Sequence, residues 1–165
     1  MERLWSPWRL AYVTGAARAT GCVFCDDGES RQPLTLVRGR LSYVVLNLYP
    51  YNSGHLMVVP DRHIGSLAGA TADELSEMMT FVRDAEVALT EAYAPHGINV
   101  GINLGRSAGA GIVDHIHVHL VPRWNGDTSF ISVVGNVRVL PEGLDDTAAR
   151  LRPVFQRLAQ ARDGT

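Results

Sequence analysis

The sequence predicts an α+β fold: an antiparallel sheet of about five strands with one long helix and a C-terminal helix. Three short β-rich runs follow one another with only turns between them, which is typical of antiparallel pairing. One stretch of helical periodicity, residues 71–94, is long enough to cover such a sheet. A row of alternating histidines and apolar residues, His115–Leu120, predicts a further strand with one face in a core.

The composition fits one soluble globular domain. The chain has 165 residues, 46% of them hydrophobic, and no apolar run approaches the length of a membrane span. The N-terminus lacks the apolar region of a signal peptide, so we expect a cytoplasmic protein that binds no membrane. The net charge of −2 argues against a nucleic-acid partner. All 15 basic residues are arginines, which excludes a P-loop lysine and leaves arginine, histidine and backbone N–H groups to bind phosphate.

The chain divides into three segments. Residues 1–21 end in a run of small residues and predict an N-terminal arm with a linker. Residues 22–140 make up the expected domain. Residues 141–165 form the expected C-terminal helix, packed on the domain or on a dimer partner.

Three strand-like runs open the domain. They are Leu34–Arg38, Tyr43–Leu48 and His55–Pro60, of which the second is especially rich in β-formers. Residues 49–54 have the composition of a turn, so we expect the second and third runs to pair antiparallel.

Residues 71–94 predict the long helix. Thr71 is the expected N-cap, Glu74 completes a capping box, and Pro95 and Gly97 follow the end of the helix. Apolar residues recur at spacings of three and four and form the stripe expected to face the sheet: Leu75, Met78, Met79, Val82, Ala85, Leu89 and Tyr93.

A strand, Ile98–Leu104, and a glycine-rich loop connect the helix to the histidine row. Glycines let backbone N–H groups approach an anion closely, although such a loop can equally be a flexible connection. Because it directly precedes the histidines, we expect it to bind phosphate through Asn103, Arg106, Ser107, Gly109 and Gly111.

The histidine row places three imidazoles, of His115, His117 and His119, on one face of the expected strand. Pro122 should end this strand because it has no N–H to donate. Neutral imidazoles in a row could bind a metal, or one could attack an electrophile while its neighbours hold the substrate. Alternatively, the three histidines have no function and simply form a polar face of the sheet that is exposed to solvent.

The C-terminal part predicts a turn, a short segment and a helix. Phe130–Val134 could be a strand or an arm that faces a partner. The helix should start at Asp145 or Asp146 and be kinked or restarted at Pro153. Its apolar face comprises Leu151, Val154, Phe155 and Leu158.

Residues His115–Val121 resemble the motif of the histidine-triad (HIT) family, in which three histidines alternate with apolar residues. The resemblance extends to Asn47, to His55 and to the loop before the triad. The flanks are most similar to the bacterial diadenosine tetraphosphate phosphorylase branch, namely Leu4–Arg9, Cys22–Cys25 and Pro122–Asp127. Many members carry Gly-Gln-Ser or Gly-Gln-Thr before the triad, where this chain has Ala110-Gly111-Ile112.

The resemblance implies a HIT-like fold, a homodimer and an enzyme that cleaves dinucleoside polyphosphates, most specifically diadenosine tetraphosphate to ATP and ADP. His117, at the centre of the row, is the expected nucleophile, with its second ring nitrogen held by a backbone carbonyl. Inorganic phosphate would release the bound adenylate as ADP, and water would release it as AMP. His119 would bind non-bridging oxygens or protonate the leaving group, and His115 would support the site or bind metal.

Other positions of the family pattern imply substrate contacts. Asn47 matches the ribose-binding residue, and His55 matches a histidine beside the active site. The base-pocket positions correspond to Phe24, Val45 and Leu48. Arg123 could reach phosphate and Trp124 could stack on a base, or both could close the core or the dimer.

Cys22 and Cys25 form a Cys-x-x-Cys pair, which in a cytosolic chain is a metal half-site or a redox pair. In zinc-bearing HIT relatives a later histidine and the first triad histidine complete the ligand set. The resemblance therefore implies a structural zinc on Cys22, Cys25, His63 and His115. The alternative is two buried thiols and a surface His63. No organic cofactor is expected.

Three other functions remain open. Hydrolysis of nucleoside phosphoramidates or adenylates would use the same nucleophile. A metallohydrolase would use the three histidines as ligands, although no carboxylate follows them in the usual pattern. A zinc-stabilised nucleotide-binding protein would need no turnover at all.

Overall fold

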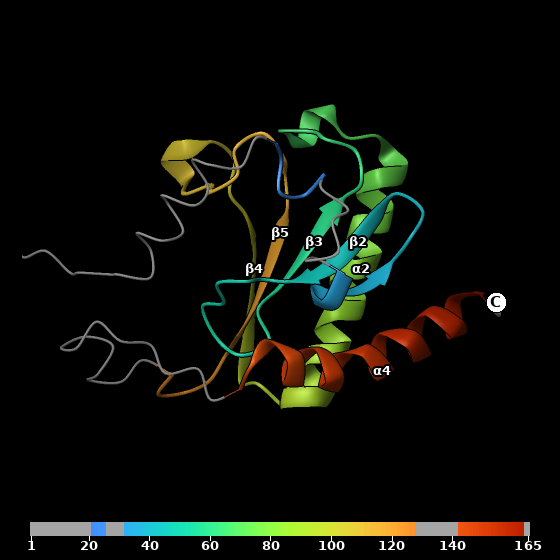
Figure 1. Cartoon of the computed structure of the whole chain (residues 1–165), viewed down its shortest axis with the longest axis vertical. Coiled ribbons are helices and arrows are strands. Elements are labelled where there is room, and N and C mark those ends of the chain that lie inside the picture. Colours follow the sequence, from blue (N-terminus) through green and yellow to red (C-terminus); the bar gives the residue numbers. More distant parts are fainter. Residues whose placement is uncertain (1–20, 26–31, 128–141, 164–165) are drawn as a thin grey trace, which may run out of the picture.

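The computed structural model describes residues 21–25, 32–127 and 142–163. Within them, five strands form one sheet in the order β1-β2-β3-β5-β4, with every neighbouring pair antiparallel (Figure 1). The strands are β1 Thr35–Arg38, β2 Ser42–Leu46, β3 Leu56–Pro60, β4 Gly97–Ile102 and β5 Val118–Arg123. The predicted α+β fold is confirmed. The expected N-terminal arm up to residue 20 and the segment Phe130–Val134 lie outside the described residues.

Helix α2, Ala72–Tyr93, covers one face of the sheet, where it contacts β2, β3 and β5 (Figure 1). Its first turn is fixed as predicted. The Glu74 carboxylate accepts from the Thr71 N–H at 2.7 Å, and Thr71 Oγ1 accepts from the Glu74 N–H at 3.2 Å. These two bonds satisfy donors that a helix start leaves without partners, so they define where α2 begins.

The apolar stripe of α2 differs from the prediction at Met79, which is 61% exposed. Successive helical residues are about 100° apart, so Met78 and Met79 do not both face the centre of the sheet. Met78 is buried, and Phe81, which the predicted stripe lacks, is 1% exposed in the core. The side of α2 that faces the sheet therefore includes Met78 and Phe81 but not Met79.

Helix α4, Leu144–Asp163, packs across α2 and β1 (Figure 1). It runs through Pro153 as one helix, so the predicted restart does not occur. Leu151 and Phe155 lie in the core below 2% exposure. Arg162 donates at 2.7 Å to the buried Asp84 of α2, which fixes the far end of the helix.

Strand β5 begins and ends later than predicted. His115 and His117 precede it, and Pro122 lies within it opposite Ile98 of β4. Pairing with β3 stops at Leu120, and the Pro122 carbonyl accepts from the Asn52 side chain at 2.9 Å. The missing N–H of Pro122 therefore points to a side where no strand needs it.

The alternation of the histidine row persists even though the strand starts late. Ile116, Val118 and Leu120 are buried in the core between sheet and α2. On the other face lies a smaller cluster of Phe24, Tyr43, Val45, Met57 and Val59. The Tyr43 hydroxyl donates to the Phe24 carbonyl at 2.9 Å, which fastens the Cys-x-x-Cys segment over this face.

No helix among the described residues has the length and apolar character needed to cross a membrane.

Candidate active site and metal cluster

The triad rings lie together on the sheet face opposite α2. The ring centroids of His117 and His119 are 4.7 Å apart, and that of Phe24 is 4.9 Å from His117. Phe24 also meets His115 edge-on at 5.5 Å. The segment 21–25 and the start of β5, nearly a hundred residues apart in sequence, thus form one site.

His117 has a defined tautomer. Its Nδ1–H donates to the backbone carbonyl of His115 at 3.0 Å, as the sequence predicts, so Nε2 carries the free lone pair. The residue is 5% exposed, and this burial lowers the pKa of the ring because charge is costly away from water. The imidazole of His117 is therefore neutral at physiological pH, with an unprotonated Nε2.

His119 has the opposite tautomer, which a chain of hydrogen bonds determines. The backbone N–H of Tyr51 can only donate, and it donates to His55 Nδ1 at 3.1 Å. His55 Nε2–H must then donate to His119 Nδ1, at 3.0 Å, which leaves the proton of His119 on Nε2. Burial, with the neighbouring His117, lowers the pKa of His119 to about 4, so the ring is a neutral donor.

Asn47 and the apolar residues around it lie beside these rings. Asn47 Oδ1 accepts from the Tyr49 N–H at 2.9 Å, and its Nδ2 lies 3.3 Å and 3.4 Å from the ring nitrogens of His55. Val45 is buried with Phe24 in the small cluster, whereas Leu48 is 54% exposed. Of the predicted base-pocket residues, Phe24 and Val45 are therefore buried, and Leu48 is exposed.

The glycine-rich loop joins β4 to the start of the triad. It contains the short helix η3, Arg106–Ala108, with Gly105 and Gly109 at positive φ of 82° and 91°. A side chain is disfavoured in this region of φ, which explains glycine at both positions. Arg106 and Ser107 are exposed, and Asn103 is half-buried. Gly101 lies opposite His119 in β4, and a Cβ added to it would meet no atom within 4 Å, so the strand leaves room beside that imidazole.

Arg123 and Trp124 lie at the opposite end of β5, six or more residues from His117 and roughly 20 Å along the strand. Arg123 donates to Asp127 at 2.6 Å and to Asn99 at 2.9 Å. The Trp124 ring packs edge-on against Tyr93 at 6.4 Å. Within one chain these two side chains stabilise a corner of the sheet, apart from the triad.

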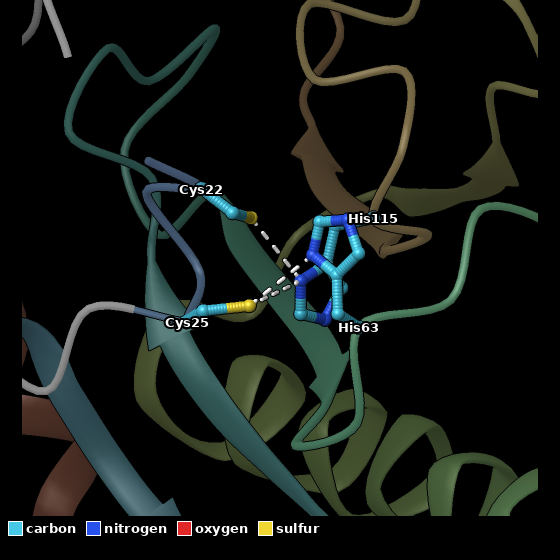
Figure 2. Close-up of side chains that lie close together, drawn as sticks. All are labelled: Cys22, Cys25, His63 and His115. Atoms are coloured by element: carbon cyan, nitrogen blue, oxygen red, sulfur yellow. Dashed lines mark hydrogen bonds between the residues drawn. The ribbon is translucent and has the colours of Figure 1, made fainter. Parts of the chain in front are cut away.

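A second cluster forms at the first histidine of the triad. Cys22, Cys25, His63 and His115 offer ligand atoms that all lie within 4.8 Å of one another, and Figure 2 shows the sulfurs and imidazoles pointing toward one another. His115 Nδ1 is 3.3 Å from Cys22 Sγ, and His63 Nδ1 is 3.2 Å from Cys25 Sγ. These four residues, predicted as ligands, could bind a metal.

The donor set fits zinc. Two thiolates and two imidazoles are a common tetrahedral set, in which sulfur and nitrogen would be about 3.6 Å apart. His115 is buried, and its Nε2–H donates to the Pro60 carbonyl at 2.8 Å. Its Nδ1 therefore faces the sulfurs without a proton, as a metal ligand must. Among the described residues His117 and His119 belong to no such cluster, which disfavours a metallohydrolase with three histidine ligands.

Tyr51 also lies at the site, although its sequence context predicts only a turn. Its ring lies 4.7 Å from His55 and 6.3 Å from His119. Two tyrosines that flank Pro50, in the turn that leads to Gly54-His55, are the sequence signal that could have identified it.

Comparisons with known proteins agree with this geometry. The HIT domain family model matches residues 33–126. Over 95% of its length the chain is 41% identical to the AP-4-A phosphorylase of Mycobacterium tuberculosis, of which it covers 86%. It is 36% identical to the asymmetrical bis(5′-nucleosyl)-tetraphosphatase of Schizosaccharomyces pombe, over 56% of this chain and 50% of that protein.

A solved structure has the same fold. The Zn-bound histidine triad family protein from Mycobacterium smegmatis aligns with a TM-score of 0.63 and 26% identity, over 94% of this chain and 97% of that one. The triad, its position on the sheet and these matches together show that the chain belongs to the HIT family.

Proposed function

We propose that the protein cleaves dinucleoside polyphosphates, most specifically diadenosine tetraphosphate, through an adenylate bound covalently to His117. One observation carries the proposal: the His117 Nδ1–H is bonded to the His115 carbonyl, so Nε2 is unprotonated and nucleophilic. The identity of 41% to a protein named AP-4-A phosphorylase supports this choice of substrate.

In the first step, His117 Nε2 attacks the α-phosphorus and a nitrogen–phosphorus bond forms. The bond from that phosphorus to the bridging oxygen breaks, and ATP leaves with the bonding electrons. The Nε2–H of His119 donates to a non-bridging oxygen or to the departing oxygen. In the second step an oxygen of inorganic phosphate attacks the same phosphorus, the bond to His117 breaks, and ADP forms. Water as acceptor would give AMP.

The remaining predicted residues have proposed roles around this reaction. Phe24, Val45 and Leu48 bind the adenine of the transferred adenylate, and Asn47 binds its ribose. The loop residues Asn103, Arg106, Ser107, Gly109 and Gly111 bind the polyphosphate through side chains and backbone N–H groups. His115 and His55 position the two reacting imidazoles. Arg123 and Trp124 are expected to reach substrate only if a partner chain brings them to the triad.

Product analysis tests the proposed function. The protein is incubated with diadenosine tetraphosphate, with and without inorganic phosphate, and the nucleotides are separated. We expect ATP with ADP when phosphate is present, and loss of turnover in His117→Gly with the fold intact. Turnover that survives this substitution would overturn the proposal. Cleavage of adenosine phosphoramidate alone would support the phosphoramidate hydrolase instead.

We also propose that Cys22, Cys25, His63 and His115 hold a structural zinc ion. The buried, deprotonated Nδ1 of His115 supports this, as does the related Zn-bound protein from Mycobacterium smegmatis. Zinc would act as a tetrahedral brace for the segment 21–25 and the start of β5. Because thiolate ligands must stay reduced, the proposed location is the cytoplasm.

The proposed assembly is a homodimer joined at β4. This strand forms one edge of the sheet, and its sequence, Gly97–Ile102, contains neither a charge nor proline, the usual protections of an edge. Val100 is 52% exposed and Leu104 47%. Light scattering should give twice the chain mass, and Val100→Lys should reduce this mass. Leu67→Lys, in the short helix η2 (Leu67–Gly69), should leave it unchanged. An unchanged mass in Val100→Lys would exclude β4 from the interface.

A further inference from the structure

Four rings follow one another across the candidate active site. Phe24 meets His117 at 4.9 Å between centroids, His117 meets His119 at 4.7 Å, and His119 meets Tyr51 at 6.3 Å. Two aromatic residues therefore flank the two imidazoles, Phe24 on the side of His117 and Tyr51 on the side of His119.

The two flanking rings differ in exposure. Phe24 is 7% exposed and packs in the small cluster on the triad face. Tyr51 is 47% exposed, and its ring is inclined by only 27° to that of His119. Tyr51 thus continues the surface of the His119 imidazole at the mouth of the site, where an aromatic group in solution can reach it.

The loop that carries Tyr51 is held in place on both sides. The Tyr51 N–H donates to His55, and the neighbouring Asn52 side chain donates to the Pro122 carbonyl at 2.9 Å and to Asp127 at 3.0 Å. The ring also packs on His55 at 4.7 Å. A ring fixed before a ligand arrives loses little conformational freedom on binding, which favours affinity.

We propose that Tyr51 is the stacking residue for the second nucleobase, that of the leaving nucleotide. It would make the site selective for substrates with a nucleoside at both ends of the polyphosphate. This inference rests on the proposed function. A dinucleoside polyphosphate has two bases separated by an anionic chain, and the site has two aromatic residues separated by two imidazoles. The transferred adenylate lies with His117 and Phe24, and the leaving nucleotide departs past the donor His119 toward Tyr51.

The test compares two substrates that share the reacting phosphorus. Diadenosine tetraphosphate has a second adenosine, and adenosine 5′-tetraphosphate lacks it. Base–aromatic stacking corresponds to roughly tenfold in affinity at a half-exposed site. For Tyr51→Leu we expect KM for diadenosine tetraphosphate to rise roughly tenfold, with a change below about twofold for adenosine 5′-tetraphosphate.

Two further variants separate stacking from structure. Tyr51→Phe keeps the ring and should keep the wild-type ratio of KM values for the two substrates. Tyr49→Leu changes another exposed tyrosine of the same turn and should leave both substrates unaffected. All three retain the backbone N–H groups of the turn, and thermal melting checks that each variant folds.

Equilibrium binding gives a readout that does not depend on turnover. In the His117→Gly background, titration calorimetry should show diadenosine tetraphosphate binding roughly tenfold tighter than adenosine 5′-tetraphosphate, and Tyr51→Leu should abolish this difference. Equal weakening of both ligands, or no weakening, would overturn the role of Tyr51. If wild-type protein does not turn over diadenosine tetraphosphate, the proposed function fails, whereas the binding ratio still decides the role of Tyr51.

Discussion

At the scale of single residues, the site depends on two neighbouring imidazoles with opposite tautomers. The His115 carbonyl holds the proton of His117 on Nδ1. The chain from Tyr51 through His55 holds the proton of His119 on Nε2. One ring therefore offers a lone pair and the other a proton, and both stay neutral because burial lowers their pKa values. This division of roles suits the proposed attack on a phosphate that carries negative charge.

The lowered pKa of His117 predicts a pH profile. Protonation would remove the lone pair on Nε2, and burial makes protonation harder than at the ordinary value of 6.5. We expect the acidic limb of kcat/KM, followed between about pH 8 and 5, to have its midpoint below pH 6.5. Steady-state kinetics across this range measures it. An acidic limb with its midpoint above pH 6.5 would contradict the neutral, buried imidazole.

His55 should act on kcat through the tautomer of His119. His55→Leu removes the donor to His119 Nδ1, and we expect kcat to fall by about tenfold or more. It also removes the acceptor for the Tyr51 N–H, so KM for diadenosine tetraphosphate should rise as well. His55→Gln has a side-chain amide that can donate and should recover part of the rate. Nitrogen-15 NMR of the ring should show the proton on Nε2 in wild type and a mixture in His55→Leu. A single Nε2–H form in both would exclude this role.

At the scale of elements, functional side chains lie where secondary structure begins or ends. His115 and His117 precede β5, His55 precedes β3, and the turn before it carries Tyr51. Helix α2 supplies no ring to the site. It buries the apolar residues of β5 and so fixes which face its histidines occupy. Substitutions at the start of α2 should therefore change the stability of the fold without changing the site.

Glu74 links the stability of α2 to pH. Its hydrogen bond from Arg62, followed by that from the Thr71 backbone, lowers its pKa from 4.5 to about 2. Its ionised form thus contributes stability above about pH 4.5, and this contribution is lost as pH falls toward 2. Glu74→Gln should cost about 1–2 kcal/mol at neutral pH, since Arg62 is half exposed.

Urea unfolding at several pH values measures this effect. The difference between wild type and Glu74→Gln should shrink between about pH 5 and 2. Glu86→Gln, at an exposed position of the same helix, serves as the control and should cost little at any pH. A difference that does not depend on pH would mean that the carboxylate charge contributes nothing.

At the scale of the whole molecule, the candidate metal cluster connects three distant segments. Cys22 and Cys25 lie near the N-terminal end of the described residues, His63 follows β3, and His115 precedes β5. The same cluster holds Phe24 over His117 and holds the residue whose carbonyl fixes the tautomer of His117. Metal binding should therefore stabilise both the fold and the position of the His117 ring.

Metal removal tests this connection. We expect a single zinc ion per chain by elemental analysis, and a melting temperature lower by roughly 5–10 °C after chelation. His63→Ala should lose the metal, while His96→Ala, at an exposed loop position, should keep it. Full stability and full activity in the metal-free protein would show that the metal stabilises neither the fold nor the site.

Most of the fold could be predicted from the sequence, because local patterns determine local structure. The capping box at Thr71 and the β-rich runs gave the elements, and the histidine alternation gave the face. The errors arose where tertiary packing decides. Met79 has the right spacing for the stripe, but the sheet covers a neighbouring arc of α2. Pro122 can lie within β5 because β3 does not extend far enough to pair with it.

The sequence by itself determined the nature of the chemistry: three imidazoles on one side of an alternating segment and a half-site of two thiols. Alternation and residue type are local properties, and they need no knowledge of the fold. Only the tertiary structure decided which nitrogen of each ring bears the proton, and that Tyr51 lies beside His119. Those features depend on contacts between residues far apart in the chain, whose distances follow from the packing of the sheet rather than from any local pattern.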